Sequence, residues 1–192
     1  MAPVVVAITG ASGAIFGIRV LERLAELEVE THLVVTRWGR VTIEQETDYT
    51  FAQVIELADV TYGESEQGAA ISSGSFLTAG MVIVPCSMKT LGSIAHGSGQ
   101  NLVSRAADVT LKERRPLILV PRETPLHSIH LRNMLLLADA GVTIAPPMPA
   151  FYNRPESVDD IVEHLTVRIL DQLSVHTDWR GRWTGLERRE RD

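Results

Sequence analysis

The first residues that could do chemistry form a loop at positions 10–14 (Gly-Ala-Ser-Gly-Ala), between an apolar run and a stretch of helical periodicity. A helix N-terminus presents free backbone N–H groups and the positive end of its dipole, so such a loop can bind phosphate. The spacing is not the dinucleotide pattern G-x-G-x-x-G, because Ser12 stands where the second glycine is needed. Nor does an acidic residue follow the next strand, where Thr36 and Arg37 stand. The loop therefore favours a mononucleotide or another phosphate ligand over NAD, and a tight turn without a ligand is the remaining alternative.

The same loop nearly matches the nucleophile elbow G-x-S-x-G of hydrolases, but its last position is Ala14. A Ser-His-acid triad of that kind also needs a histidine after a late strand, and none of the six histidines is predicted there. These two departures argue against a hydrolase.

Two further strand ends carry polar residues. At residues 85–90 (Pro-Cys-Ser-Met-Lys-Thr), Ser87 and Thr90 offer hydroxyl groups beside a second helix N-terminus. Cys86 could be a nucleophile, although packing is the commoner role of a lone cysteine at a buried strand end. Arg122 and Glu123 directly follow another apolar run, where charges are costly unless they are paired or bind a ligand. This pair suits a phosphate contact next to an acid or base.

Three other segments each allow two interpretations. The rigid apolar loop at residues 146–152, which ends in Tyr152, could wall a substrate pocket or contact another subunit. The charge run from Arg105 to Arg115 has the pattern of a solvated helix face. His127 and His130 are not joined by a clear ligand set, so a core or capping role is expected and no metal is predicted.

The elements that must position these residues alternate between strand and helix. Short apolar runs predict strands at 4–9, 31–36, 81–84, 117–120 and 142–144. Helices are predicted at 15–28, 38–47, 50–58, 88–96, 102–113, 128–140 and 157–173, with a loop over 63–80. This alternation predicts a single-domain α/β fold: a doubly wound, mostly parallel sheet with helices on both faces, Rossmann- or flavodoxin-like in three layers. Sites in such sheets form beyond the carboxyl ends of the strands, where the residues above are found.

Composition narrows the function class. The 192 residues are 45% hydrophobic, which is ample for one core, and the net charge of −6 argues against nucleic acid as a partner. No apolar run approaches the roughly 20 residues that span a bilayer, so no membrane association is expected. A single cysteine and a start without a signal-peptide pattern predict a cytoplasmic protein.

Taken in order, these motifs resemble the flavin prenyltransferase family, of the UbiX or phenylacrylic acid decarboxylase subunit type. The resemblance runs from Val4 to Trp183 and rests on the loop at 10–14 and on residues 46–48, 72–76, 85–90, 105–116, 120–125 and 147–152. It implies a flavin-binding prenyltransferase domain at 1–175 and a C-terminal arm at 176–192 that covers the site.

The resemblance also implies a reaction. Reduced FMN and dimethylallyl monophosphate would be joined, flavin N5 to prenyl C1 and flavin C6 to prenyl C3, without a metal. The product, prenylated FMN, would serve a UbiD-type decarboxylase. Two alternatives are a flavin-dependent cysteine decarboxylase-like enzyme and a non-catalytic flavin carrier subunit of an aromatic-acid decarboxylase. Members of the family form large homo-oligomers, commonly homo-dodecamers.

Site residues are implied by position. The FMN contacts would be Gly10, Ala11, Ser12, Thr36, Ser87, Met88, Lys89, Thr90 and Arg122. The substrate contacts would be Arg105, Lys112, Tyr152, Arg168 and Trp183, with Tyr152 and Arg168 on the prenyl phosphate. The catalytic groups would be Ser12, Glu46, Lys112 and Glu123, with the two glutamates moving protons. Some of these residues are expected to come from a neighbouring subunit.

Overall fold

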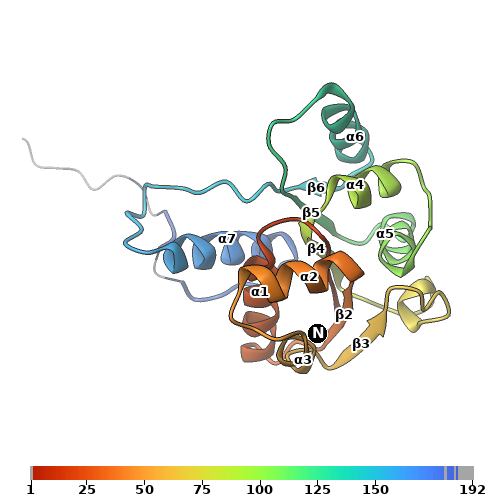
Figure 1. Ribbon diagram of the computed structural model, residues 1–192, viewed down its shortest axis with the longest axis horizontal. Helices are drawn as coiled ribbons and strands as arrows, with labels where there is room; N and C mark the ends of the chain where they lie inside the picture. Colours follow the sequence, from red (N-terminus) through yellow and green to blue (C-terminus); the bar gives the residue numbers. More distant parts are fainter. Residues whose placement is uncertain (1, 180, 184, 186–192) are drawn as a thin grey trace, which may run out of the picture.

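A computed structural model describes residues 2–179, 181–183 and 185, and it shows one parallel sheet enclosed by helices (Figure 1). The sheet has six strands in the order β3-β2-β1-β4-β5-β6, and every pairing is parallel. The strands are β1 Val4–Ile8, β2 Thr31–Val35, β3 Val60–Gly63, β4 Gly80–Cys86, β5 Leu117–Pro121 and β6 Thr143–Ile144. The predicted doubly wound α/β fold is therefore confirmed.

Helices cover both faces of the sheet. They are α1 Ala14–Glu26, α2 Arg37–Glu46, α3 Phe51–Glu56, α4 Met88–Ala95, α5 Leu102–Lys112, α6 Ser128–Asp139 and α7 Val158–Gln172, with a 3₁₀ turn at Ala70–Ser72. Alternate residues of β1 enter two apolar clusters, because successive side chains of a strand point to opposite faces. Val6 lies in the cluster with α1, α2, α3 and α7, whereas Ala7 lies in the cluster with α4, α5 and α6. These two clusters define the three layers that the sequence predicts.

The sequence-based prediction of a loop after residue 63 misses an edge strand just before it. In β3, exposed and half-buried residues alternate, and Tyr62 donates or accepts a hydrogen bond of 2.9 Å with His32 of β2. Such a short, half-exposed strand lacks the continuous apolar run by which the central strands are recognised. The prediction also ends the strand at 81–84 too early, because β4 continues through Pro85 to Cys86.

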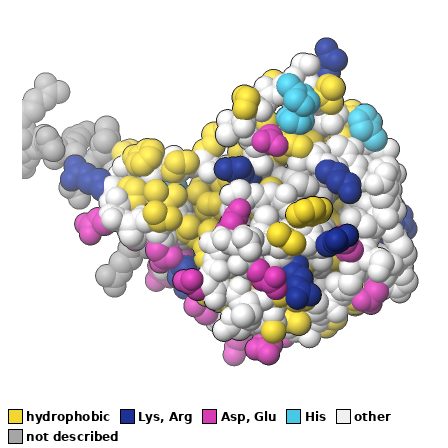
Figure 2. Space-filling model, in the orientation of Figure 1, with side chains coloured by type: hydrophobic (Ala, Val, Ile, Leu, Met, Phe, Trp, Pro, Cys, Tyr) yellow, Lys and Arg dark blue, Asp and Glu magenta, His cyan; other side chains and the backbone are white. Residues whose placement is uncertain are grey.

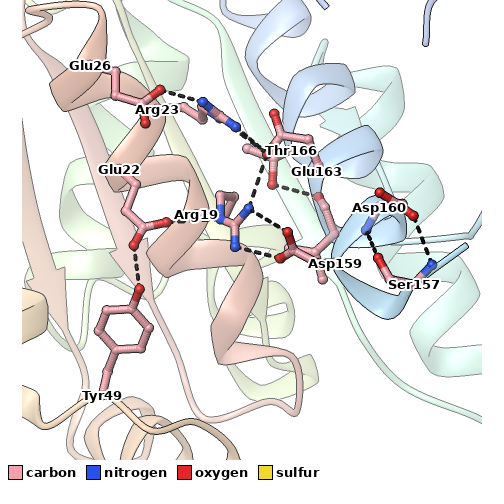
Figure 3. A network of polar contacts seen from close by, with 11 residues as sticks. Arg19, Glu22, Arg23, Glu26, Tyr49, Ser157, Asp159, Asp160, Glu163 and Thr166 are labelled. Carbon is pink, nitrogen blue, oxygen red and sulfur yellow. Dashed lines mark hydrogen bonds and ion pairs between the residues drawn. The ribbon is translucent and has the colours of Figure 1, made fainter. Parts of the chain in front are cut away.

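Helix α7 is tied to α1 by an ion-pair network (Figure 3). Arg19 donates to Asp159 Oδ1 at 2.7 Å, and one turn further along both helices Arg23 Nη2 lies 2.9 Å from Glu163. Because the contacts follow the same order on both helices, α7 runs alongside α1 in the same direction. The end of α7 therefore lies towards the amino end of β4, where a Cβ on Gly80 would lie 3.0 Å from Leu173.

The described part of the C-terminal segment packs against α7. Both terminal guanidinium nitrogens of Arg182 donate to the carboxylate of Asp171 at 2.8 Å. The predicted arm at 176–192 is described only in part, because positions 180, 184 and 186–192 lie outside the described residues. Of the helices that the structure describes, none is long and apolar enough to cross a membrane.

Candidate functional site

A pocket of about 560 Å³ lies at the carboxyl ends of the strands, over the point where the chain turns to opposite sides of β1. This is where doubly wound sheets bind their ligands, and the volume falls in the range of small-molecule sites. Its lining comes from the segments after β1, β2, β3 and β4 and from the start of α5: Gly10, Thr36, Arg37, Trp38, Glu64, Ser65, Ser87, Lys89, Thr90, Ser93, Gln100, Asn101 and Ser104. Of the predicted FMN contacts, Gly10, Thr36, Ser87, Lys89 and Thr90 are brought together here.

Three helices begin at this pocket, and a side chain in its wall caps each one. Thr36 accepts from the N–H of Gly39 at 3.1 Å at the start of α2. At the start of α4, the hydroxyl of Ser87 accepts from the N–H of Thr90 at 3.3 Å. At the start of α5, the side-chain oxygen of Asn101 accepts from the N–H of Ser104 at 3.0 Å. The positive ends of three helix dipoles therefore face one space.

Two cations add to that field. Arg37 and Lys89 line the same pocket as the three capping residues. Together, these groups suit an anionic group such as a nucleotide phosphate, and the hydroxyls of Thr36 and Ser87 suit the polar edge of its ring. Sequence reasoning missed Asn101, although its spacing from Ser104 is a capping-box signal.

Thr9 fixes the position of the second loop relative to the first. Its hydroxyl donates to the carbonyl of Pro85 at 2.8 Å and accepts from the N–H of Ser87 at 2.8 Å. Thr9 is 1% exposed, so this pair of bonds is shielded from water. Its signal in the sequence is a polar residue that closes an otherwise apolar strand.

Gly10 allows the first loop to meet Trp38 closely. A Cβ at position 10 would lie only 2.3 Å from the Cβ of Trp38, a separation that real atoms do not reach. The side chain of Trp38 is 66% exposed and forms part of the pocket wall. Glycine is therefore needed at position 10 for steric reasons, to keep this wall in place.

The N-terminus of α1 already has an anionic partner. Glu46 Oε2 accepts from the N–H of Gly13 at 2.7 Å and from the N–H of Ala14 at 3.3 Å. Glu46 is the last residue of α2, so the contact joins two helices to the loop that carries Ser12. The predicted catalytic residues Glu46 and Ser12 are thus brought together, and two N–H groups predicted to be free for phosphate instead bind a carboxylate.

Other predicted residues lie near the same sheet edge but outside the pocket lining. The backbone N–H of Arg122 donates to the carbonyl of Cys86 at 3.3 Å, which places it at the end of β5. The side chains of Arg122 and Glu123 are exposed there, and Glu123 accepts from the N–H of Thr124 at 3.0 Å. Ala11 is buried, and Met88 packs against the apolar cluster of α4 and α5.

Lys112 lies far from the pocket within one chain. It is the last residue of α5, whose first turn is capped at the pocket by Asn101, and a helix rises about 1.5 Å per residue. The two ends of α5 are therefore roughly 16 Å apart. Lys112 pairs with Glu113, and Arg105, one turn into the helix, pairs with Asp108 at 2.7 Å.

The remaining predicted substrate contacts gather on α7. The hydroxyl of Tyr152 lies 2.9 Å from Nε2 of His164, and its ring meets the ring of Trp183 edge-on at 5.5 Å. Arg168 lies one turn beyond His164 and pairs with Asp171 at 3.1 Å. A single chain thus assembles a nucleotide-type pocket and, separately, this aromatic and cationic group on α7.

The lone cysteine is placed as a packing residue. Cys86 is fully buried in the cluster beneath α4, and burial raises the pKa of its thiol far above the ordinary range. A thiol that stays protonated is a poor nucleophile. Within the described part of the chain, no group of three or more His, Cys, Asp and Glu side chains is arranged to hold a metal ion.

Comparison with known proteins gives consistent results. Residues 1–170 match the Flavoprotein family. The chain is 62% identical to a probable UbiX-like flavin prenyltransferase of Streptomyces sp. (strain D7), over 95% of this chain and 92% of that protein.

Solved structures show the same relationship. A dodecameric FMN-dependent UbiX-like decarboxylase from Escherichia coli O157:H7 superposes with a TM-score of 0.93 at 53% identity, covering 95% of this chain and 100% of that one. AnUbiX (PadA1), solved in complex with FMN and dimethylallyl pyrophosphate, superposes with a TM-score of 0.92 at 49% identity, covering 97% and 99%. The predicted resemblance is therefore confirmed, and the chain belongs to the UbiX-like flavin prenyltransferases of the Flavoprotein family.

Proposed function

We propose that this protein transfers the dimethylallyl group of dimethylallyl monophosphate to reduced FMN and so makes prenylated FMN. In this reaction the C1–O bond of the prenyl substrate breaks and phosphate leaves with the electron pair. Flavin N5 bonds to C1 and gives up its proton. The C2=C3 double bond then takes up a proton at C2, flavin C6 bonds to C3, and the proton on C6 leaves, which closes a fourth ring. The observation that carries the proposal is the convergence of three helix N-termini, with Arg37 and Lys89, on one pocket at the sheet edge.

Within that pocket we assign the FMN contacts to the strand-end loops. The nucleotide would lie against Thr36, Ser87 and Lys89, where the dipoles and the cation favour its phosphate. The isoalloxazine ring would extend towards Ser12 and Glu46, which the N–H groups of the first loop hold together. Ala11, Met88, Thr90 and Arg122 are proposed as further contacts.

The prenyl phosphate needs positive charge, because charge develops on the leaving phosphate. Arg105, Lys112 and Arg168 are proposed to supply it, with Tyr152 and Trp183 beside them. Glu123, exposed at the end of β5, is proposed to move a proton together with Glu46.

We propose that a complete site needs more than one subunit, in a homo-dodecamer. Lys112 and the α7 group lie away from the pocket of their own chain, so a neighbouring copy would have to bring them to it. Figure 2 shows apolar side chains gathered over the segment between β6 and α7. Met148 and Phe151 of this segment, and Val158 at the start of α7, are 69–76% exposed, as expected of a surface that another subunit covers.

The place of the protein in the cell follows from its product. We propose a cytoplasmic enzyme whose prenylated FMN is taken up by a UbiD-type decarboxylase. The domain at 1–175 would hold the chemistry, and the arm at 176–192 would cover the site.

The deciding experiment incubates the purified protein with reduced FMN and dimethylallyl monophosphate under anaerobic conditions. The expected result is a flavin whose mass is increased by one dimethylallyl group, with a changed absorbance spectrum. A parallel incubation with the pyrophosphate measures the leaving-group preference. Bound FMN without any prenylated product would refute the transferase and favour a non-catalytic flavin carrier.

A further inference from the structure

The phenol of Tyr152 is held by a histidine of α7. Tyr152 lies in a segment between β6 and α7 that has no helix or strand of its own, and it is 49% exposed. Its hydroxyl lies 2.9 Å from Nε2 of His164, and the two rings meet nearly at right angles, at 88° and 5.5 Å. An irregular segment does not fix a side chain by itself. The ring of Trp183 packs edge-on against Tyr152, and the contact with a regular helix holds its hydroxyl.

His164 is itself firmly placed. It is 4% exposed, and its ring stacks on the indole of Trp179 with ring centroids 5.0 Å apart and planes 28° apart. Burial, and secondly the charge of Arg168, lower the pKa of His164, so the imidazole is neutral near pH 7. A neutral imidazole carries one N–H, and Nε2 can therefore either donate to the phenol oxygen or accept from it.

His164 lies between Tyr152 and Arg168, the two residues that are expected to bind the prenyl phosphate. Arg168 follows His164 by four positions, so both side chains leave the same face of α7. Tyr152 reaches that face through its hydrogen bond to His164. If one phosphate binds both Arg168 and Tyr152, the phenol must donate its O–H to that phosphate. The O–H is free to do so when Nε2 of His164 donates to the phenol oxygen and does not accept from it.

We propose that His164 is a positioning residue: it donates from Nε2 to the hydroxyl of Tyr152 and so directs the phenol proton towards the phosphate of the prenyl substrate. This proposal rests on the proposed function, because it concerns the substrate of the same site. His164 itself does not touch the substrate. Its effect is therefore confined to the prenyl phosphate and leaves FMN binding unchanged.

The test compares His164→Phe, which keeps an aromatic ring against Trp179, with Tyr152→Phe, which removes the hydroxyl. Each variant should raise the KM for dimethylallyl monophosphate about 3- to 10-fold, the effect of one hydrogen bond. The Kd for FMN should stay unchanged in both. The double variant should be no worse than either single one, because both changes remove the same interaction. His164→Gln, whose amide can donate to the phenol, should recover part of the loss.

Two controls separate this role from a general loss of structure. His96→Phe alters an exposed histidine at the end of α4 and should leave the KM unchanged. Thermal unfolding and FMN binding of His164→Phe show whether the variant folds. If it does not fold, the comparison of His164→Gln with Tyr152→Phe carries the test.

The outcomes are distinguishable. Additive effects of the two Phe variants, an unchanged KM in His164→Phe, or an FMN affinity that falls together with the KM would overturn the role of His164. Calorimetric binding of dimethylallyl monophosphate to the FMN-loaded protein keeps the test independent of turnover. A wild-type protein that binds the prenyl phosphate without forming product refutes the proposed function alone, and one that does not bind it refutes both.

Discussion

Two replacements of Glu46 distinguish its structural role, capping the N-terminus of α1, from its proposed chemical role, moving a proton. Its carboxylate accepts two N–H groups, from Gly13 at 2.7 Å and from Ala14 at 3.3 Å, at the positive end of α1. Hydrogen bonds to charged groups contribute roughly 1.5–3 kcal/mol each when shielded, but exposed ionic contacts fall to about 0–1 kcal/mol. Glu46 is exposed but makes two such contacts at the positive end of a helix dipole, so we expect Glu46→Ala to lower the free energy of unfolding by about 1–2 kcal/mol.

Glu46→Gln should behave differently, because its amide oxygen can still accept from Gly13. We expect its unfolding free energy to stay within about 0.5 kcal/mol of the wild type, with FMN still bound. If Glu46 moves a proton during ring formation, the amide cannot, and the rate should fall by about 100-fold or more.

Three measurements on each variant test this reasoning. Thermal unfolding should show a Tm about 2–8 °C lower for Glu46→Ala, since 1 kcal/mol shifts a domain of this size by about 2–4 °C. Flavin fluorescence measures FMN binding, and quenched samples analysed by mass give the rate of product formation. A wild-type rate in Glu46→Gln would remove the residue from the chemistry, whereas an unchanged Tm in Glu46→Ala would show that the cap contributes nothing.

The other predictions concern the pocket wall and the attachment of α7. Gly10→Ala should displace Trp38 and reduce the FMN bound per chain, measured by absorbance, whereas Gly68→Ala, with nothing within 4 Å of its Cβ, should not. Glu163→Ala removes the carboxylate that pairs with both Arg19 and Arg23 of α1, so the free energy of unfolding in denaturant should fall by about 1–2 kcal/mol. An unchanged value would show that water replaces these ion pairs without loss of stability. The hydrogen bond from Arg182 holds the pKa of Asp171 below its usual range. The contact therefore stabilises the folded C-terminal segment above about pH 4, and this stabilisation is lost as the pH falls further. Tail tryptophan fluorescence should report that loss, and Asp171→Asn should abolish its pH dependence.

The sequence predicts the central sheet well because its strands are buried on both faces. β1 and β5 are apolar throughout and β2 and β4 mostly so, which is typical of parallel strands that helices cover on both faces. The helix predicted at 157–173 also begins where expected, and a capping box between Ser157 and Asp160 holds its start. The edge strand β3 is missed because it is short and half-exposed, so its pairing with β2 depends on tertiary context.

For the site, the sequence identifies which residue types stand at the strand ends, and the parallel sheet brings Gly10, Thr36 and Ser87 to one pocket. The sequence does not show that the helix beginning at Asn101 also points at this pocket, because the distance from the end of β4 to the start of α5 is set by packing. Nor does it show that Glu46 occupies the N-terminus of α1, since that contact spans 33 positions of the chain. The fold and the family can be predicted from the sequence, because local periodicity and ordered motifs encode both. Which polar groups already satisfy one another, and which still face an open pocket, depends on how the helices pack, because these hydrogen bonds join distant segments of the chain.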